Sequence, residues 1–249
     1  MNERPDLVEL WKEGIVKIAD GIIRVWDREG QLGQFVDQHT GAMIVGNSSS
    51  AGIASAGLVL ASRLTGHKEY CSKALEIADY YYENFTTKCF SCGGPGEILQ
   101  GSDSESCYGL LESYTAIYEY TNDAKWLNRA EEQARQFSSW VMSYDYAFPT
   151  GSEFNRLEMT TTGAVFANVQ NKHLSPGICT HSGISLLKLY RATGNKKYLE
   201  LLRDIAHAVS QYISRDDRPI FAQDHSVLRP GWINERVNTS DWDNNLGGV

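Results

Sequence analysis

The chain has 249 residues, of which 42% are hydrophobic and 11% aromatic, so it can bury a sizeable core in one large domain or at most two. Its formal charge of -8, from 23 basic and 31 acidic side chains, argues against a surface that follows the phosphates of nucleic acid. The composition therefore favours a globular protein and excludes nucleic acid as the expected partner.

The N-terminal segment predicts a helix rather than a targeting signal. Residues 1–14 are charged and lack the apolar stretch of a secretory signal, and no later run approaches the length of a membrane span. A lone first helix is expected at about Asp6 to Asp27. We expect no membrane partner and a cytoplasmic location, or an extracytoplasmic one if the chain is a piece of a longer protein.

Three similar turns follow, and each precedes an amphipathic helix. They lie in "RLTGHKEYC", "EYTNDAKWL" and "RATGNKKYL", with Thr65, Thr121 and Thr193 at unequal distances along the chain. The unequal spacing excludes ankyrin and tetratricopeptide arrays, whose repeats are constant in length. We predict helical hairpins near residues 49–84, 104–144 and 182–214.

The two helices of each predicted hairpin differ in their apolar pattern. After the third turn, Tyr198, Leu202, Ile205, Val209 and Tyr212 recur at helical steps, which indicates an outer helix with one buried side. The segments before the turns, such as "SSSAGIASAGLVLAS" and "ISLLKLY", are apolar nearly all round. We interpret these as inner helices buried between neighbours.

The connections between hairpins are long and carry most of the polar motifs. They cover roughly residues 28–48, 85–103, 145–181 and 215–240, and loops of this length without obvious secondary structure usually serve function. Each leads into the N-terminal end of an inner helix or the chain end. If the hairpins pack side by side, the connections gather on one face.

Four of these connecting segments resemble those of a known family. In order, they are "GQLGQFVDQHTGAMIVGNSSSAG", "GGPGEILQGSDSES", "VQNKHLSPGICTHSG" and "GWINERVNTSDW". They look like the α/α-toroid, or six-hairpin, glycoside hydrolases of gut and environmental bacteria. The resemblance implies an all-α fold with hairpins around a central cleft, and a carbohydrate substrate. Unsaturated glucuronyl hydrolases, polysaccharide lyases and sugar epimerases are related toroids, so the fold alone does not choose the reaction.

The chain departs from that family in its number of hairpins. A closed toroid has six, whereas this sequence predicts a leading helix and three hairpins, or about seven main helices. We therefore predict one α/α-toroid domain over residues 1–249 that is open, or a piece of a larger toroid. An open end would expose apolar helix faces, which favours a homo-oligomer or a longer chain.

A carbohydrate-active enzyme needs particular groups on the loop face. Hydrolysis commonly uses two carboxyl groups roughly 5 to 10 Å apart, whereas a lyase uses a base beside a group that neutralises a uronate. We predict a glycoside hydrolase acting on oligosaccharides. Helix N-termini that converge on the cleft would slightly favour uronic-acid-containing glycans. The alternatives are a non-catalytic sugar-binding or assembly module, or a lyase or epimerase on the same fold.

The segment "GGPGEILQGSDSES" supplies three carboxylates. Asp103 stands at the first turn of a predicted helix, where an active-site acid would sit and where the helix dipole stabilises negative charge. We expect Asp103 to be the first catalytic carboxylate, with Glu97 or Asp241 as the second. Ser102 and Glu105 have capping-box spacing, so Glu105 is interpreted first as a cap and otherwise as a substrate-binding residue.

The segment "NVQNKHLSPGICTHSG" supplies Gln170, Asn171, His173 and His181. Neutral amides and imidazoles offer paired donors and acceptors, which suit sugar hydroxyls, so we predict that these four side chains bind substrate. The alternative is that they bond the loop to itself and that His181 caps its helix.

The tail "PGWINERVNTSDWDNN" also offers groups that could bind or cleave a sugar. Asp241 would add a carboxylate, Arg236 a cation and Trp242 a ring on which a sugar can stack. Ser240 and Asp243 have capping-box-like spacing, which is the competing structural explanation.

No cofactor or metal is expected. The sequence has no nucleophile elbow "GxSxG", no "HExxH" and no phosphate-binding loop with its lysine. The five cysteines make an odd count, which fits reduced thiols. Cys89 and Cys92 have zinc-compatible spacing, but no second such pair follows them.

Overall fold

The computed structural model describes residues 4–95, 99–175, 183–221, 225–233 and 236–239. The chain forms two compact units. Unit 1 comprises Met1–Gly101 and Gly109–Gln133, and unit 2 comprises Ser102–Tyr108 and Ala134–Val249. The expectation of one domain over residues 1–249 stays a prediction.

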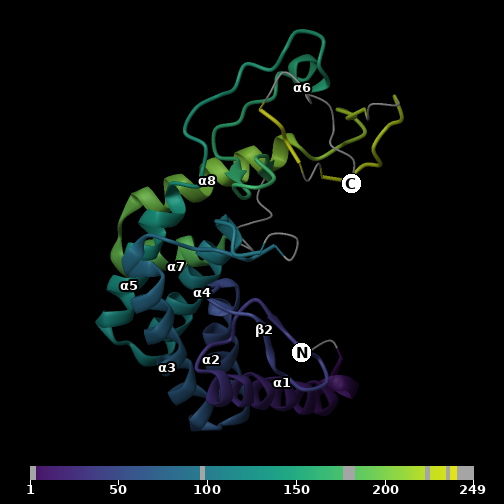
Figure 1. The fold of residues 1–249 in the computed structure, drawn as a ribbon. Coiled ribbons are helices and arrows are strands. Elements are labelled where there is room, and N and C mark those ends of the chain that lie inside the picture. Colours follow the sequence, from purple (N-terminus) through teal and green to yellow (C-terminus); the bar gives the residue numbers. More distant parts are fainter. Residues whose placement is uncertain (1–3, 96–98, 176–182, 222–224, 234–235, 240–249) are drawn as a thin grey trace. The chain divides into compact units, whose positions relative to one another are not determined.

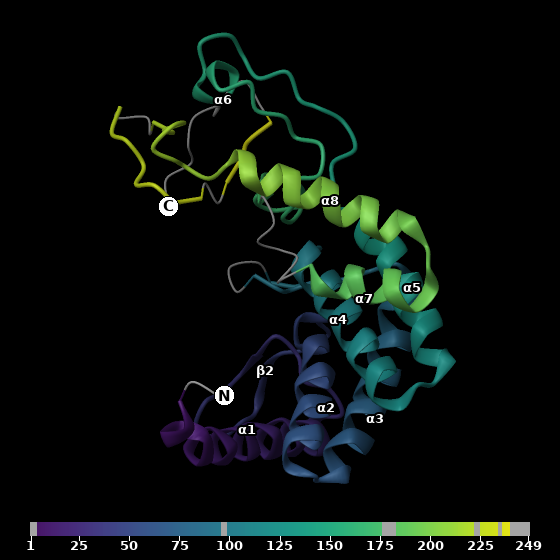
Figure 2. The ribbon, with the colours of Figure 1, turned by 180° about the vertical axis from the view of Figure 1, so that it is seen from behind.

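Helices dominate the described residues, as Figures 1 and 2 show. The α-helices are α1 (Val8–Glu29), α2 (Ala54–Thr65), α3 (Lys68–Asn84), α4 (Ser104–Thr121), α5 (Ala124–Ser138), α6 (Glu153–Arg156), α7 (Ile184–Thr193) and α8 (Lys196–Gln211). Short 3₁₀-helices are η1 (Pro5–Leu7), η2 (Ser50–Ile53) and η3 (Thr86–Lys88). The antiparallel strand pairs are β1 (Phe35–Val36) with β2 (Met43–Val45), and β3 (Val165–Phe166) with β4 (Leu174–Ser175). The prediction of a leading helix followed by three hairpins is confirmed.

The three hairpin turns share one hydrogen-bonding device. Each threonine hydroxyl donates to the carbonyl oxygen four residues earlier at 2.7 to 2.9 Å and accepts the backbone N–H two residues later at 3.1 to 3.3 Å. The residue after each threonine adopts the left-handed conformation that ends a helix, which glycine and asparagine tolerate best. These pairs are Thr65–Gly66, Thr121–Asn122 and Thr193–Gly194.

The core of unit 1 lies between the inner helices α2 and α4. The Ser113 hydroxyl donates to the Gly52 carbonyl at 2.7 Å and accepts the Ala56 N–H at 3.1 Å, so α4 satisfies backbone groups at the start of α2. A Cβ atom at Gly52 would lie 2.4 Å from the Leu110 side chain, so any larger residue there would force that buried side chain to move. As expected of an inner helix, α2 packs against several neighbours and buries six of its twelve residues, although Leu60 remains 55% exposed.

The outer helices of unit 1 are joined by side chains at a constant separation of 50 residues. Tyr70 of α3 donates to Asp20 of α1 at 2.8 Å, and Tyr82 of α3 donates to Glu132 of α5 at 2.8 Å. Arg129 of α5 is buried, forms an ion pair with Asp79, and lies 3.9 Å from the centre of the Tyr82 ring. Side chains 50 residues apart therefore connect α3 to both α1 and α5.

Unit 2 combines the α7–α8 hairpin with a second hydrophobic core. Tyr212, at the end of α8, is fully buried and packs edge-on against Phe154 of α6 at a centroid distance of 5.7 Å. Ala208 of α8 and residues from several connecting segments complete this core; the latter are Phe148, Met159, Ala164, Leu174, Ile220 and Val237. The connection at 145–181, expected as a loop, thus contains a short helix, a strand pair and core residues.

Candidate functional site

A small antiparallel sheet in unit 2 brings several connecting segments together. Its central segment, residues 163–169, pairs on one edge with residues 140–142 and 102–104, and on the other with residues 173–175. Leu174 in turn exchanges two backbone hydrogen bonds of 2.9 Å with Val237 of the tail. Parts of three segments that the sequence predicts as walls of one cleft are therefore neighbours in this unit.

Asp103 caps α4 at the edge of this sheet. Its side chain is fully buried, and Oδ1 accepts the Ser106 N–H at 2.7 Å. The N-cap is therefore Asp103 rather than Ser102, so the proposed Ser102–Glu105 capping box is wrong by one residue. The Ser102 carbonyl instead accepts the Val169 N–H at 3.1 Å, which places Ser102 in the sheet. Asp103 therefore places a buried carboxylate at the N-terminus of an 18-residue inner helix, where the helix dipole stabilises negative charge.

Asn168 shapes the loop between β3 and β4. Its Oδ1 atom accepts the backbone N–H groups of Gln170 at 3.1 Å and Asn171 at 2.7 Å, and its own side chain is almost completely buried. The side chains of Gln170 and Asn171 are exposed. Asn168 was not among the site residues expected from the sequence, although an asparagine two residues before a polar turn is a known signal for such a loop.

His173 is buried beside the same loop. Its Nδ1 atom lies 3.1 Å from the Leu174 carbonyl oxygen and 3.4 Å from the Ser175 hydroxyl. A carbonyl oxygen only accepts hydrogen bonds, so the contact with Leu174 requires a proton on Nδ1. In the neutral ring, Nε2 is then the acceptor.

Asp103 and His173 are bonded to adjacent parts of the central segment. Asp103 lies opposite Asn168, and the His173 carbonyl accepts the Ala167 N–H at 3.0 Å. The Ala167 carbonyl instead accepts the Ser104 N–H at 3.0 Å, so Ala167 links the segments that carry Asp103 and His173. Joint action of Asp103 and His173 on one ligand stays a prediction.

The other predicted site residues fall into two classes. Four of them lie outside the described residues: Glu97, Asp241, His181 and Trp242. Among the described ones, Glu105 is half-buried in the first turn of α4, and Arg236 is exposed next to Val237.

In unit 1, the connections at 28–48 and 85–103 are also bonded to each other. Gln34 Oε1 accepts the Gln100 N–H at 3.1 Å, and Gln100 Nε2 donates to the Gly46 carbonyl at 2.7 Å. The Ser49 hydroxyl accepts the Cys92 N–H at 2.8 Å. These two polar segments thus meet beside the start of α2, which agrees with their expected association.

Two carboxylates of unit 2, Asp145 and Glu153, hold loops through hydrogen bonds. Hydrogen bonds from the hydroxyl and N–H of Thr162 and from the N–H of Thr161 lower the pKa of Asp145. Burial raises the pKa of Glu153, but its hydrogen bonds from Arg156 and the Phe221 N–H outweigh that effect and lower it overall. Both contacts tie distant parts of the connecting segments together.

The described residues contain no group of three or more His, Cys, Asp or Glu side chains placed to hold a metal ion. Cys92 is buried and Cys89 is exposed. Within the same residues, none of the helices combines the length and apolar character that crossing a membrane requires.

Solved structures match the fold, whereas no protein-family model and no curated protein matches the chain. An unsaturated glucuronyl hydrolase from Streptococcus agalactiae is 17% identical with a TM-score of 0.55, over 90% of this chain and 53% of that one. The unsaturated glucuronyl hydrolase of Bacillus sp. GL1, described as responsible for glycosaminoglycan degradation, is 14% identical with a TM-score of 0.56, over 93% and 65%. A D-mannose isomerase is 11% identical with a TM-score of 0.52, over 80% and 51%.

These likenesses confirm the predicted fold class: the chain is all-α with the α/α-toroid fold. The aligned part covers between 51% and 65% of the length of those three structures.

Proposed function

We propose that the chain is a glycoside hydrolase acting on glycans, with uronic-acid-containing oligosaccharides as the preferred class. The observation that carries the proposal is the small sheet of unit 2, which joins polar connecting segments at the N-terminus of inner helix α4. The likeness to two unsaturated glucuronyl hydrolases supports the choice of substrate class.

Asp103 is the proposed catalytic carboxylate. Because its Oδ1 atom is held by the Ser106 N–H, the group is positioned before a substrate arrives, as a proton-transferring or nucleophilic group must be. The helix N-terminus beside it favours the ionised form of Asp103. Glu97 or Asp241 would supply the second carboxyl group. The proposed substrate contacts are Gln170, Asn171, His173, His181, Glu105, Arg236 and Trp242.

The substrate proposal is tested with a panel of oligosaccharides. The panel contains unsaturated uronides, saturated uronides, neutral glycosides and free aldoses, and each reaction is followed by product analysis. Hydrolysis of a uronide at the highest kcat/KM supports the proposal. Turnover confined to neutral glycosides would overturn the uronate preference, and binding without any turnover would leave the sugar-binding module as the function.

The role of Asp103 is tested with Asp103→Asn, because asparagine is as good an N-cap as aspartate and should preserve the fold. We expect a loss of kcat of at least about 100-fold, the usual scale for a catalytic acid or base. The matched control is Asp123→Asn at the start of α5, where Asp123 accepts the Lys125 N–H at 2.9 Å. Equal activity of the two variants would contradict a catalytic role for Asp103.

A sugar isomerase or epimerase is the second candidate, because the chain also resembles the D-mannose isomerase. The same panel separates the two: aldose–ketose interconversion without cleavage would identify this alternative.

A cytoplasmic location, and a homo-oligomer or longer chain as the complete assembly, are further parts of the proposal. Cell fractionation and native mass measurement test these two points.

A further inference from the structure

Two connecting segments of unit 1 place side-chain amides around Gly46. The Gln31 amide lies directly beside this glycine, because a Cβ atom added at Gly46 would meet the amide atoms at 3.0 to 3.2 Å. Gln100 Nε2 donates to the Gly46 carbonyl oxygen at 2.7 Å. Asn47 is the next residue along the chain, and its backbone N–H donates to Gln31 Oε1 at 2.7 Å. We call Gln31, Asn47 and Gln100 the amide cluster.

The amide cluster keeps hydrogen-bonding groups that the fold does not use. Gln31 accepts through Oε1, which leaves its Nε2 as a donor, and Gln100 donates through Nε2, which leaves its Oε1 as an acceptor. Asn47 is exposed, and its side-chain amide offers both donors and an acceptor. None of the hydrogen bonds between described residues uses these remaining atoms. The cluster can therefore bind a ligand without breaking a contact of the described chain.

The backbone of the cluster adopts an uncommon conformation. The φ angle is 49° at Asn47 and 55° at Gln100, in the left-handed region that glycine adopts most readily. The Gln100 side chain has a structural role there, since it holds the Gly46 carbonyl oxygen. Asparagine tolerates this conformation better than most residues, as it does at Asn122 after α4. A substitution must therefore separate a backbone role of Asn47 from a binding role.

The chemistry of the amide cluster suits a neutral sugar. The hydrogen bonds that join its members to one another and to Gly46 involve no charged side chain. Sugar hydroxyls both donate and accept, and neutral amides offer the matching acceptors and donors. Phe35 of β1 is 38% exposed and lies opposite Val45, the residue before Gly46. An exposed ring at this place can cover the apolar face of a sugar.

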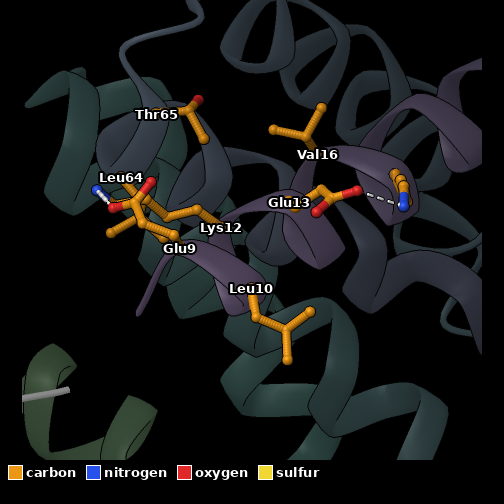
Figure 3. A pocket seen from close by; sticks show the side chains of 8 residues that line it. Glu9, Leu10, Lys12, Glu13, Val16, Leu64 and Thr65 are labelled. Atoms are coloured by element: carbon orange, nitrogen blue, oxygen red, sulfur yellow. Dashed lines mark hydrogen bonds and ion pairs between the residues drawn. The ribbon is translucent and has the colours of Figure 1, made fainter. Parts of the chain in front are cut away.

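The groove along α1 offers no comparable set of groups among the described residues. Its charged side chains pair with each other, Glu9 with Lys12 at 2.9 Å and Glu13 with Lys17 at 2.6 Å, and Figure 3 draws both pairs as dashed lines. Leu64 of α2 supplies an apolar wall of the groove. Because the opposite charges satisfy each other, the amide cluster is the better candidate for a binding site in unit 1.

We propose that the amide cluster is a subsite for a neutral sugar residue of an oligosaccharide. Gln31 Nε2 donates to one sugar hydroxyl, Gln100 Oε1 accepts from another, and the Asn47 amide contacts the same sugar. Gly46 has no side chain, which allows the Gln31 amide to lie against the backbone. The choice of a carbohydrate ligand rests on the proposed function, whereas the subsite consists of residues outside those named there.

Isothermal titration of the full chain with neutral tetrasaccharides of glucose, galactose and mannose tests the proposal. We expect at least one of them to bind, and Asn47→Gly to weaken that binding by about three- to tenfold, the scale of one neutral hydrogen bond. Glycine adopts the left-handed conformation without steric cost, so Asn47→Gly should keep the melting temperature of the wild type. Asn122→Gly makes the same change at the left-handed residue after α4 and should bind as the wild type does. Equal affinity of Asn47→Gly and the wild type, or no binding of any of the three sugars, would rule out the subsite.

A second pair of variants tests the position of Gln31. Gly46→Ala adds a Cβ atom at 3.0 to 3.2 Å from the Gln31 amide, which must then shift by a few tenths of an ångström. We expect weaker sugar binding in Gly46→Ala and unchanged binding in Gly57→Ala, because a Cβ atom at Gly57 of α2 meets nothing within 4 Å. Unchanged affinity of Gly46→Ala would contradict the role given to Gln31.

The titration reports affinity whether or not the chain cleaves a glycan, so the subsite and the proposed reaction can fail separately. Binding that depends on Asn47 in a chain without turnover would support the subsite and reject the hydrolase. Cleavage of a uronide by a chain that binds no neutral tetrasaccharide would support the hydrolase and reject the subsite.

Discussion

The two units reach stability by different routes. In unit 1, side chains 50 residues apart connect α3 to α1 and to α5, and inner helices pack through glycine and serine. In unit 2, the second core is formed largely by connecting segments, with Phe148, Phe154 and Met159 packed beneath α8. Yet Thr193 of unit 2 makes the same turn contacts as Thr65 of unit 1. Both units therefore contain the hairpin repeat, and they differ in how much of the core the connecting segments form.

The largest expected effect comes from emptying the core of unit 2. Phe154→Ala removes a fully buried ring that contacts Phe148 at a centroid distance of 5.2 Å and Tyr212 at 5.7 Å. We expect a loss of about 3 to 5 kcal/mol, measured by denaturant unfolding. Hydrogen exchange should show lost protection in residues 145–175, with α2 and α3 unchanged.

The half-exposed Leu199 of α8 provides the control, since Leu199→Ala creates no cavity. Equal loss of protection in α2 and α3 after Phe154→Ala would mean that the two units unfold as one, which would break the comparison between them.

A smaller effect is expected from the outer-helix contacts of unit 1. Arg129→Ala removes a buried guanidinium that pairs with Asp79 and lies 4.7 Å from the centre of the Trp126 ring. We expect a loss of about 2 to 3 kcal/mol, with exchange increased in α3 and α5. Arg135→Ala, at an exposed position of α5, should change stability by less than about 0.5 kcal/mol. Similar effects of the two substitutions would show that the loss in the free energy of unfolding comes from removing a charge, and not from the burial and ring stacking of Arg129.

The smallest effect concerns the pH dependence of the unit 2 loops. Asp145 has a pKa below its ordinary 3.8 because Thr162 and Thr161 donate to it, so the folded chain binds fewer protons than the unfolded one. Its stabilising contribution is complete above about pH 4 and declines as the pH falls through the lowered value. Asp145→Asn should remove this part of the acid dependence, worth less than about 1 kcal/mol at an exposed site. Denaturant unfolding at pH 7 and at pH 3 measures the change in the free energy of unfolding. Asp216→Asn, at an exposed position, is the control. If Asp145→Asn loses as much stability at pH 3 as the wild type does, Asp145 is not the source of this acid dependence.

The helices and their order could be read from the sequence because both depend on local signals. Apolar spacing in Tyr198–Tyr212, the threonine before each turn, and the glycine or asparagine after it act within one or two helical turns of the chain. The first helix was expected at about Asp6 to Asp27 and spans Val8–Glu29. Asp103 was likewise expected at the start of an inner helix, although the cap itself was assigned to Ser102.

Tertiary structure alone decided which connecting segments meet. Backbone hydrogen bonds between residues 102–104, 163–169, 173–175 and Val237 join parts of the chain far apart in sequence, and no local pattern specifies such partners. The same holds for Leu60 of α2, which is 55% exposed in a helix whose sequence is apolar nearly all round. Local sequence determined the helices of this protein because their hydrogen bonds are local, while the sheet at the candidate site required long-range pairing that only the folded chain supplies.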